Sequence, residues 1–214
     1  MKKDLTEVVF ILDRSGSMHS LTSDTIGGFN SLLQKQKEEK GECLVSTVLF
    51  NDKSFVLYDR LPIEEINDMS EKDYNASGCT ALIDALGDAI KHIKTVHKYI
   101  REEDRPEHTI FIITTDGLEN ASHKYSSDEI KKLVERQKEE GWEFVFLGAN
   151  IDAVETAKHY GIDENRSTNY VSDSKGTMKN FEVLSSMLAE VREYGAIDED
   201  WSIEIKEDYK KRKN

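Results

Sequence analysis

The sequence predicts an α/β fold: a doubly wound, mostly parallel central sheet with one antiparallel edge strand and helices on both faces. Short apolar runs rich in β-branched residues alternate along the chain with longer amphipathic stretches, as parallel α/β domains require. The apolar runs are continuous, which is typical of strands covered by helices on both faces. Two of these runs stand on either side of a short polar turn, a spacing that predicts a hairpin and hence one antiparallel strand.

In the first part of the chain, the run VVFIL at residues 8–12 predicts a buried strand. Residues 24–40 carry apolar side chains three and four positions apart and predict a helix that ends at the following glycine. Residues 44–50 and 54–58 form the predicted hairpin. Residues 60–78 are mixed and polar, so we expect a connection with one turn of helix.

The rest of the domain continues the alternation. Residues 80–101 carry one apolar stripe and predict a long helix, which the apolar strand TIFIIT at 109–114 follows. Residues 126–140 begin with two serines that suit a helix N-terminus, and residues 143–147 predict another core strand. The remaining expected elements are a short helix at 152–160, a weaker strand at 168–171 and a final helix at 176–194.

The whole pattern predicts a single domain over residues 1–195 and a charged tail over 196–214. In the tail, Trp201, Ile203 and Ile205 alternate with polar residues, so we expect an added edge strand or a cap on the sheet. The lysine-rich end KKRKN is expected to be disordered.

Charge and cysteine content narrow the function. The 214 residues include 29 Lys and Arg and 42 Asp and Glu, a net charge of −13. Such a surface repels nucleic acids and anionic membranes, so neither is expected as a partner. Cys43 and Cys79 are too few for a disulfide framework or a zinc set, which favours a reducing compartment. The first apolar run is too short for a signal segment or a membrane span, and we expect a cytoplasmic protein.

Three polar clusters mark the candidate site. Residues 13–17 (DRSGS) and 114–117 (TTDG) directly follow or end apolar strands, and residues 77–80 (SGCT) lead into the long helix. Ligands of such sheets bind outside the carboxyl ends of the strands. Asp13, Ser15 and Ser17 alternate and share one face of an extended loop, so their oxygens can point at one hard cation.

These residues resemble a known family. Asp13-Arg14-Ser15-Gly16-Ser17 matches the D-x-S-x-S signature of von Willebrand factor A (vWA) domains. Thr80 in GCTALIDAL and Asp116 in TTDGLEN resemble the threonine and aspartate that complete the family's metal-ion-dependent adhesion site (MIDAS). The resemblance covers about residues 6–195, and the segment FLGANIDAVETAKHYGI is similar to bacterial and phage members.

The resemblance implies a metal site made of Asp13, Ser15, Ser17, Thr80 and Asp116. It implies that the two serines ligate Mg²⁺ directly, that Thr80 does so directly or through water, and that the two aspartates act mainly through bound waters. Mn²⁺ or Ca²⁺ are alternative ions. Because few direct ligands are anionic, the ion stays electrophilic and its open position attracts an Asp or Glu of a partner protein. The expected function is therefore a protein-binding module, acting as an intracellular adaptor and not as an enzyme.

Two other function classes compete with a protein-binding module. An Mg²⁺-dependent phosphohydrolase of the haloacid dehalogenase type also begins with an aspartate after the first strand, but it needs a second aspartate where Ser15 stands. Nucleotide binding lacks support, because neither the P-loop pattern nor G-x-G-x-x-G occurs. Glu119 and Asn120 follow the cluster at residues 114–117, and they either line the rim of the site or stabilise the loop itself. Cys79 precedes Thr80, and we expect a buried inert thiol there, with a redox-sensitive loop as the alternative.

Overall fold

The computed structural model describes residues 1–213. Its core is a sheet of six strands: β1 (Lys2–Asp13), β2 (Glu42–Phe50), β3 (Ser54–Pro62), β4 (Pro106–Thr115), β5 (Glu143–Gly148) and β6 (Ser167–Asn169). The strand order is β3-β2-β1-β4-β5-β6, and every neighbouring pair is parallel except β2 with β3. The predicted fold class is confirmed.

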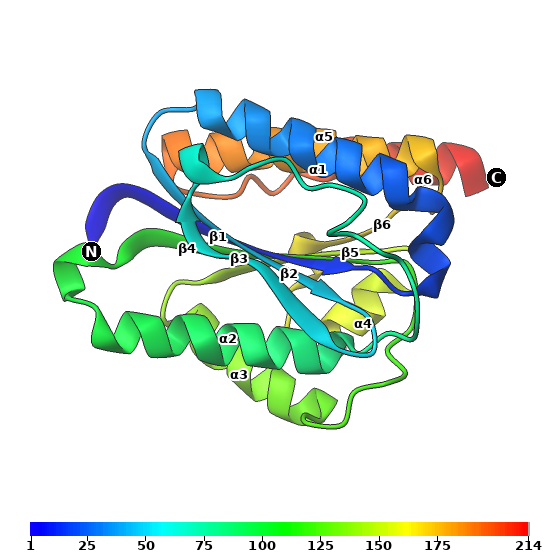
Figure 1. Cartoon of the computed structure of the whole chain (residues 1–214), viewed down its shortest axis with the longest axis horizontal. Coiled ribbons are helices and arrows are strands. Elements are labelled where there is room, and N and C mark those ends of the chain that lie inside the picture. Colours follow the sequence, from blue (N-terminus) through cyan, green and yellow to red (C-terminus); the bar gives the residue numbers. More distant parts are fainter. Residues whose placement is uncertain (214) are drawn as a thin grey trace.

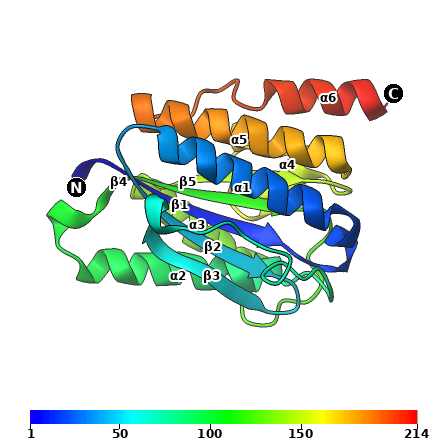
Figure 2. The same cartoon turned by 45° about the horizontal axis from the view of Figure 1, so that its top comes forward.

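Helices cover both faces of this sheet (Figures 1 and 2). Helices α1, α5 and α6 lie on one face, and α2, α3 and α4 lie on the other. None of these described helices is long and apolar enough to cross a membrane. The helices are α1 (Thr22–Glu38), α2 (Leu82–Tyr99), α3 (Ser127–Glu139), α4 (Ala153–His159), α5 (Ser174–Tyr194) and α6 (Ile203–Lys213), with short 3-10 helices η1 (Gly16–Leu21), η2 (Ile63–Glu65), η3 (Glu102–Asp104) and η4 (Glu164–Arg166).

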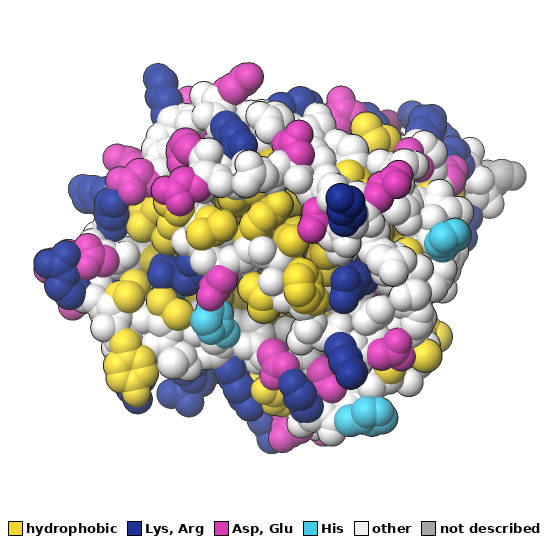
Figure 3. All heavy atoms as spheres, viewed as in Figure 1, with side chains coloured by type: hydrophobic (Ala, Val, Ile, Leu, Met, Phe, Trp, Pro, Cys, Tyr) yellow, Lys and Arg dark blue, Asp and Glu magenta, His cyan; other side chains and the backbone are white. Residues whose placement is uncertain are grey.

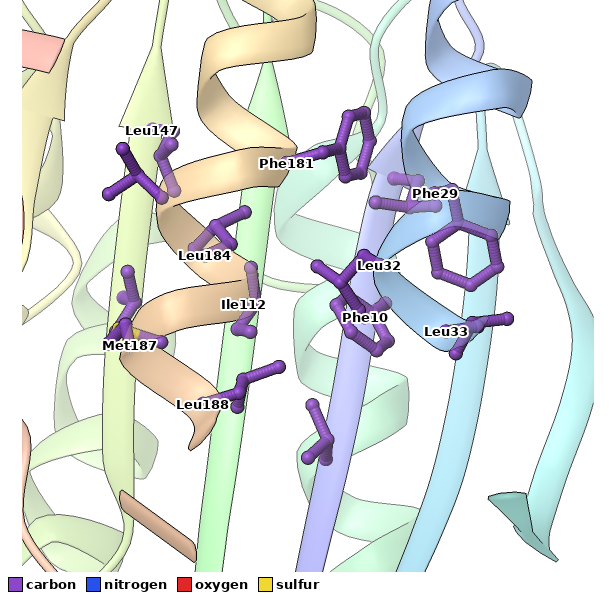
Figure 4. Packing of buried hydrophobic residues seen from close by; sticks show 14 of the residues in the cluster. Phe10, Phe29, Leu32, Leu33, Ile112, Leu147, Phe181, Leu184, Met187 and Leu188 are labelled. Carbon is purple, nitrogen blue, oxygen red and sulfur yellow. The ribbon is translucent and has the colours of Figure 1, made fainter. Parts of the chain in front are cut away.

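The continuous apolar runs are explained by two separate cores. Successive residues of β1 point to opposite faces, so that Phe10 packs under α1 and α5 while Val9 and Ile11 pack against α2. Figure 4 shows the first core, where the Phe10 ring meets Phe29 edge to face at 5.1 Å between centroids. Neither face of the strand meets water, and an alternating pattern is therefore not needed.

One charged group lies inside this apolar sheet. Glu7 of β1 is fully buried, forms an ion pair with Arg60 of β3, and makes a hydrogen bond of 2.6 Å with His97 Nε2 of α2. Arg60 adopts a left-handed backbone conformation, with φ of 51°, and its N–H donates to Ser46 Oγ at 3.0 Å. The buried carboxylate thus ties the edge strand and the end of α2 to the central strand.

The edge strand β3 carries exposed apolar side chains, Phe55 and Val56 among them. Figure 3 shows hydrophobic side chains at the surface between the two helix layers, where β3 forms the edge in Figure 1. The β2–β3 ladder shifts register between Val45 and Thr47 and again between Thr47 and Val48. Such bulges interrupt the regular edge onto which another strand would pair.

The tail differs from the expected edge strand. Residues 203–213 form helix α6, including the first four residues of the KKRKN end, while Asn214 lies outside the described residues. Trp201 and Ile205, four positions apart, are buried, whereas Ile203 between them is 52% exposed. The burial period is therefore helical, and the alternation of apolar residues in the sequence was misleading. Arg212 pairs with Asp173 and Asp208, which holds the last turn in place.

Substitutions at two adjacent glycines of α1 test how this helix packs against α5. An alanine Cβ at Gly28 would lie 2.3 Å from Cδ2 of Phe181, whereas at Gly27 it would meet nothing within 4 Å. We expect Gly28→Ala to lower the free energy of unfolding by about 1–3 kcal/mol through overpacking. Gly27→Ala should raise it by up to about 1 kcal/mol through helix propensity. Urea denaturation measures both, and equal effects of the two variants would contradict this packing.

Candidate metal centre

The first site loop begins where β1 ends. Asp13 is the last residue of β1 and is 1% exposed, and Ser15 stands at the N-terminus of η1. The Ser15 N–H donates to Asp13 Oδ1 at 2.7 Å, so the loop turns around the carboxylate. Ser17 follows in the first turn of η1 and is exposed.

Asp13 is held from two further sides. Thr115 Oγ1 of β4 donates to Asp13 Oδ2 at 2.6 Å, and the Tyr74 hydroxyl donates to the Asp13 carbonyl. Burial raises the pKa of the Asp13 carboxyl, although the hydrogen bonds from Thr115 and Ser15 oppose this shift, and nearby Asp116 raises it further. Both carboxylate oxygens of Asp13 therefore already have a protein donor.

The loop at residues 13–17 and the loop at residues 114–117 meet through hydroxyl groups. Ser17 Oγ lies 3.1 Å from Ser15 Oγ and donates to Asp116 Oδ1 at 2.5 Å. Ser172 Oγ donates to Asp116 Oδ2 at 3.5 Å, and Asn150 Nδ2 donates to the Asp116 carbonyl at 3.2 Å. Burial raises the pKa of the Asp116 carboxyl, with the Ser17 hydrogen bond opposing it. A cation between these oxygens would favour the charged form of both aspartates.

Thr80 joins this group from the second loop, which comprises residues 77–80. Its N–H donates to Asn120 Oδ1 at 2.9 Å, and its carbonyl accepts from the Asn120 N–H at 3.0 Å. The residue is 4% exposed, yet its hydroxyl makes no hydrogen bond to another described residue. A Cβ built on Gly117 would lie 3.9 Å from both Ser17 Oγ and Thr80 Oγ1, so the three loops meet at this glycine.

The second loop is fixed against the first by its glycine. Gly16 N–H donates to the Gly78 carbonyl at 3.0 Å. Gly78 has φ of 78°, and a Cβ there would lie 1.9 Å from Asp52 Oδ2, so both conformation and space require glycine. The same carboxylate accepts the Cys79 N–H at 3.2 Å.

The expectation of a buried Cys79 is wrong, because its side chain is exposed. The Cys79 backbone N–H donates to the carboxylate of Asp52 in the hairpin turn. The adjacent Asp52 raises the pKa of the Cys79 thiol, which disfavours the reactive thiolate.

The structure thus brings all five predicted residues together at the carboxyl ends of β1 and β4 and the start of α2. They offer two carboxylates and three hydroxyls, an all-oxygen set that fits a hard divalent cation. With only two carboxylates, the set holds no cluster of three His, Cys, Asp or Glu, and no such cluster occurs among residues 1–213. The unpartnered Thr80 hydroxyl is the observation that fits an additional ligand best.

Two supporting residues, Thr115 and Tyr74, were missed at the sequence level. Thr115 belongs to the polar cluster at residues 114–117, and its position beside Asp116 could have indicated its role. Tyr74 comes from the irregular connection between β3 and α2, where no periodicity marks it. Glu119 and Asn120 serve the loop: Asn120 binds the Thr80 backbone, and Glu119 Oε2 accepts the Ile83 N–H at 2.9 Å at the start of α2.

Comparison with solved structures places the fold among vWA domains. The vWF domain of the type V pili tip protein Mfa5 from Porphyromonas gingivalis superposes with a TM-score of 0.63 at 10% identity, over 90% of this chain and 98% of that one. Proximal thread matrix protein 1 from the mussel byssus, with a zinc-occupied MIDAS motif, gives 0.59 at 13% identity over 86% of this chain. Manganese-loaded TRAP protein from Plasmodium vivax gives 0.56 at 16% identity, over 85% of this chain and 74% of that one.

This chain spans 46% of the length of the mussel protein that it matches. No family model matches the sequence. No curated protein matches it either. At identities of 10–16% the similarity is one of fold, and the chain is accordingly a protein with the Rossmann-like α/β fold of vWA domains.

The hydrogen bond from Thr115 to Asp13 allows a test of the site's internal support. Thr115→Val keeps the shape of the side chain but leaves Asp13 Oδ2 without its donor. We expect the free energy of unfolding to fall by about 1–3 kcal/mol, the usual cost of an unsatisfied buried polar group. Thr114→Val, one position earlier on the same strand, is the matched control and should change stability much less. Equal losses in both variants would show that the hydroxyl has no special role.

Proposed function

We propose that this chain is a protein-binding module that holds a divalent cation with Asp13, Ser15, Ser17, Thr80 and Asp116. Mg²⁺ is the expected ion, with Mn²⁺ or Ca²⁺ as alternatives. An open coordination position of the ion would capture an Asp or Glu carboxylate of a partner protein. Mussel and Plasmodium proteins of the same fold, described as zinc-occupied and manganese-loaded, support a metal at this place in the fold.

The observation that carries the proposal is the convergence of hydroxyls from three loops beside two buried aspartates. Ser15, Ser17 and Thr80 are neutral ligands, and a cation held mainly by neutral groups keeps most of its charge for an incoming anion. The aspartates balance that charge from slightly farther away, since both oxygens of Asp13 are already hydrogen-bonded. Such a site attracts a carboxylate more strongly than a site made of several direct carboxylate ligands would.

The same geometry favours binding over phosphohydrolysis. An aspartyl nucleophile needs a free carboxylate oxygen directed at the substrate. Asp13 Oδ1 accepts from the Ser15 N–H and Oδ2 accepts from Thr115, so the carboxylate is engaged on both sides. No second aspartate stands at position 15, where the hydrolase pattern requires an acid.

The rim suggests the kind of partner surface. Leu118, two residues after Asp116, is 65% exposed. On the first loop, the Arg14 guanidinium lies 5.5 Å from the centre of the exposed Phe55 ring. A partner acid flanked by apolar side chains would meet complementary groups on both sides of the ion. Cys43 and Cys79 are both free thiols, which favours an adaptor acting inside the cell.

Metal binding can be measured without a partner. At ten times its dissociation constant, Mg²⁺ should raise the melting temperature by about 3–6 °C through linkage. Because burial raises the pKa of the Asp13 and Asp116 carboxyls, protons should begin to weaken metal binding at a higher pH than at ordinary aspartates. Calorimetry at pH 5 and pH 7 and thermal melts test both statements.

Asp116→Asn should abolish the metal-dependent shift in melting temperature. Its metal-free protein should melt no lower than the parent, because one buried charge is removed while the side-chain shape is retained. Asp128→Asn, on the exposed face of α3, is the matched control and should keep the shift. A full metal response in Asp116→Asn would contradict the proposed site.

Partner capture needs a second experiment. The immobilised protein should retain a partner from native lysate in Mg²⁺ but not in EDTA, and Thr80→Ala should lose that partner while keeping its fold. Thr95→Ala, an exposed threonine of α2, is the control and should bind as the parent does. Retention that ignores both EDTA and Thr80→Ala would refute carboxylate capture at the ion.

A further inference from the structure

A cavity lies at the opposite end of the sheet from the candidate metal centre. It has a volume of about 390 Å³ and is bordered by the ends of α2 and α3 and by the start of β4. Figure 1 shows this end beside the N-terminus, away from the arrowheads of the parallel strands. The volume is within the range of sites that hold small molecules.

The cavity contains buried polar groups without partners. The Gln137 side chain is 3% exposed, and its amide oxygen has no hydrogen bond within the described chain. Arg105 Nε, at the start of β4, is also buried and unpartnered. Buried amide and guanidinium groups are normally satisfied, and leaving them unpaired costs stability. A ligand that accepts hydrogen bonds would satisfy the Arg105 Nε–H, and the NH₂ group of the Gln137 amide could donate to the same ligand.

Basic side chains surround these groups. The cavity is lined by Lys94, Lys98, Arg105 and Arg136, and none of them forms a salt bridge with a described residue. Three glutamates also line the cavity, and Glu107 among them already accepts the Asp4 N–H at 2.9 Å. Four cations against three glutamates give this lining a small excess of positive charge, in a protein of net charge −13.

Helix ends explain only part of this cluster. Lys98 and Arg136 stand in the last turns of α2 and α3, where cations offset the partial negative charge of the helix C-terminus. Lys94 lies a turn earlier, and Arg105 belongs to no helix. The buried Gln137 amide gains nothing from a helix dipole. Lys94, Arg105 and the Gln137 amide therefore remain unexplained, and each can donate hydrogen bonds to a ligand in the cavity.

We propose that this cavity binds a small multivalent oxyanion, namely a phosphate-bearing molecule. Phosphate oxygens accept several hydrogen bonds at once, and Arg105 and Arg136 have the planar donor geometry that suits them. The ligand would be held by Arg105, Arg136, Gln137 and the lysines of α2. The site is independent of the metal centre and does not rest on the proposed function.

The test is calorimetric titration of the metal-free full chain with inorganic pyrophosphate, at constant ionic strength and without divalent cations. Saturable binding at one site is expected. Arg105→Gln and Arg136→Gln should each weaken it about tenfold or more, the usual effect of losing a charged hydrogen bond. Gln137→Met should also weaken binding, yet melt at the same or a higher temperature without ligand, because it removes an unsatisfied buried amide.

Lys158→Gln is the matched control, because Lys158 is an exposed lysine in the last turn of α4 and lies outside the cavity. Its affinity for pyrophosphate should equal that of the parent. Two results would overturn the proposal: the absence of saturable binding, or an equal loss in Lys158→Gln and Arg105→Gln, which would indicate diffuse charge attraction.

Discussion

The burial of the Asp13 carboxylate is the interaction on which the rest of the candidate site depends. One oxygen takes the Ser15 N–H and the other takes the Thr115 hydroxyl, so the ends of β1 and β4 and the first loop are held together at one point. Tyr74 binds the Asp13 carbonyl and brings in the connection after β3. A buried carboxylate with these donors can move little, and the hydroxyl groups beside it are therefore held in place as well.

The sheet divides the chemistry of the molecule between its two ends. Parallel pairing brings the carboxyl ends of β1, β2 and β4 to one edge, where loops leave side-chain oxygens in reach of each other. At the other end, α2 and α3 finish near the start of β4, and nitrogen donors gather there. Between the ends, two apolar cores fill both faces, and buried Glu7, which pairs with Arg60, is the main charged exception. The proposed cation site and the proposed anion site are thus kept far apart by the length of the strands.

Much of the fold could be predicted because the central residues of β1, β4 and β5, at 8–12, 110–113 and 144–147, are apolar without interruption. That pattern is typical of strands covered on both sides. The site residues were predictable as clusters because each follows a strand or precedes a helix. Tyr74 was not, since an irregular connection has no period. Of the two expectations for the tail, the edge strand was wrong, because Ile203 faces solvent while Trp201 and Ile205 are buried at helical spacing. The other expectation, a cap on the sheet, agrees with the packing of α6 against β6. Which side an apolar residue faces is decided by the neighbours it meets, and sequence spacing alone does not contain that information.

Helix α6 packs against α5 and β6, the strand at the far edge of the sheet. The Trp201 indole donates to the Asn165 carbonyl just before β6, and Ile205 is buried below it. These residues follow all six strands in the chain and leave the ribosome after them. A nascent chain would therefore complete its sheet while the β6 side is still uncovered, and that side would be open to chaperones or to misassociation until α6 emerges. Closure of this edge would therefore come after the pairing of β6 with β5.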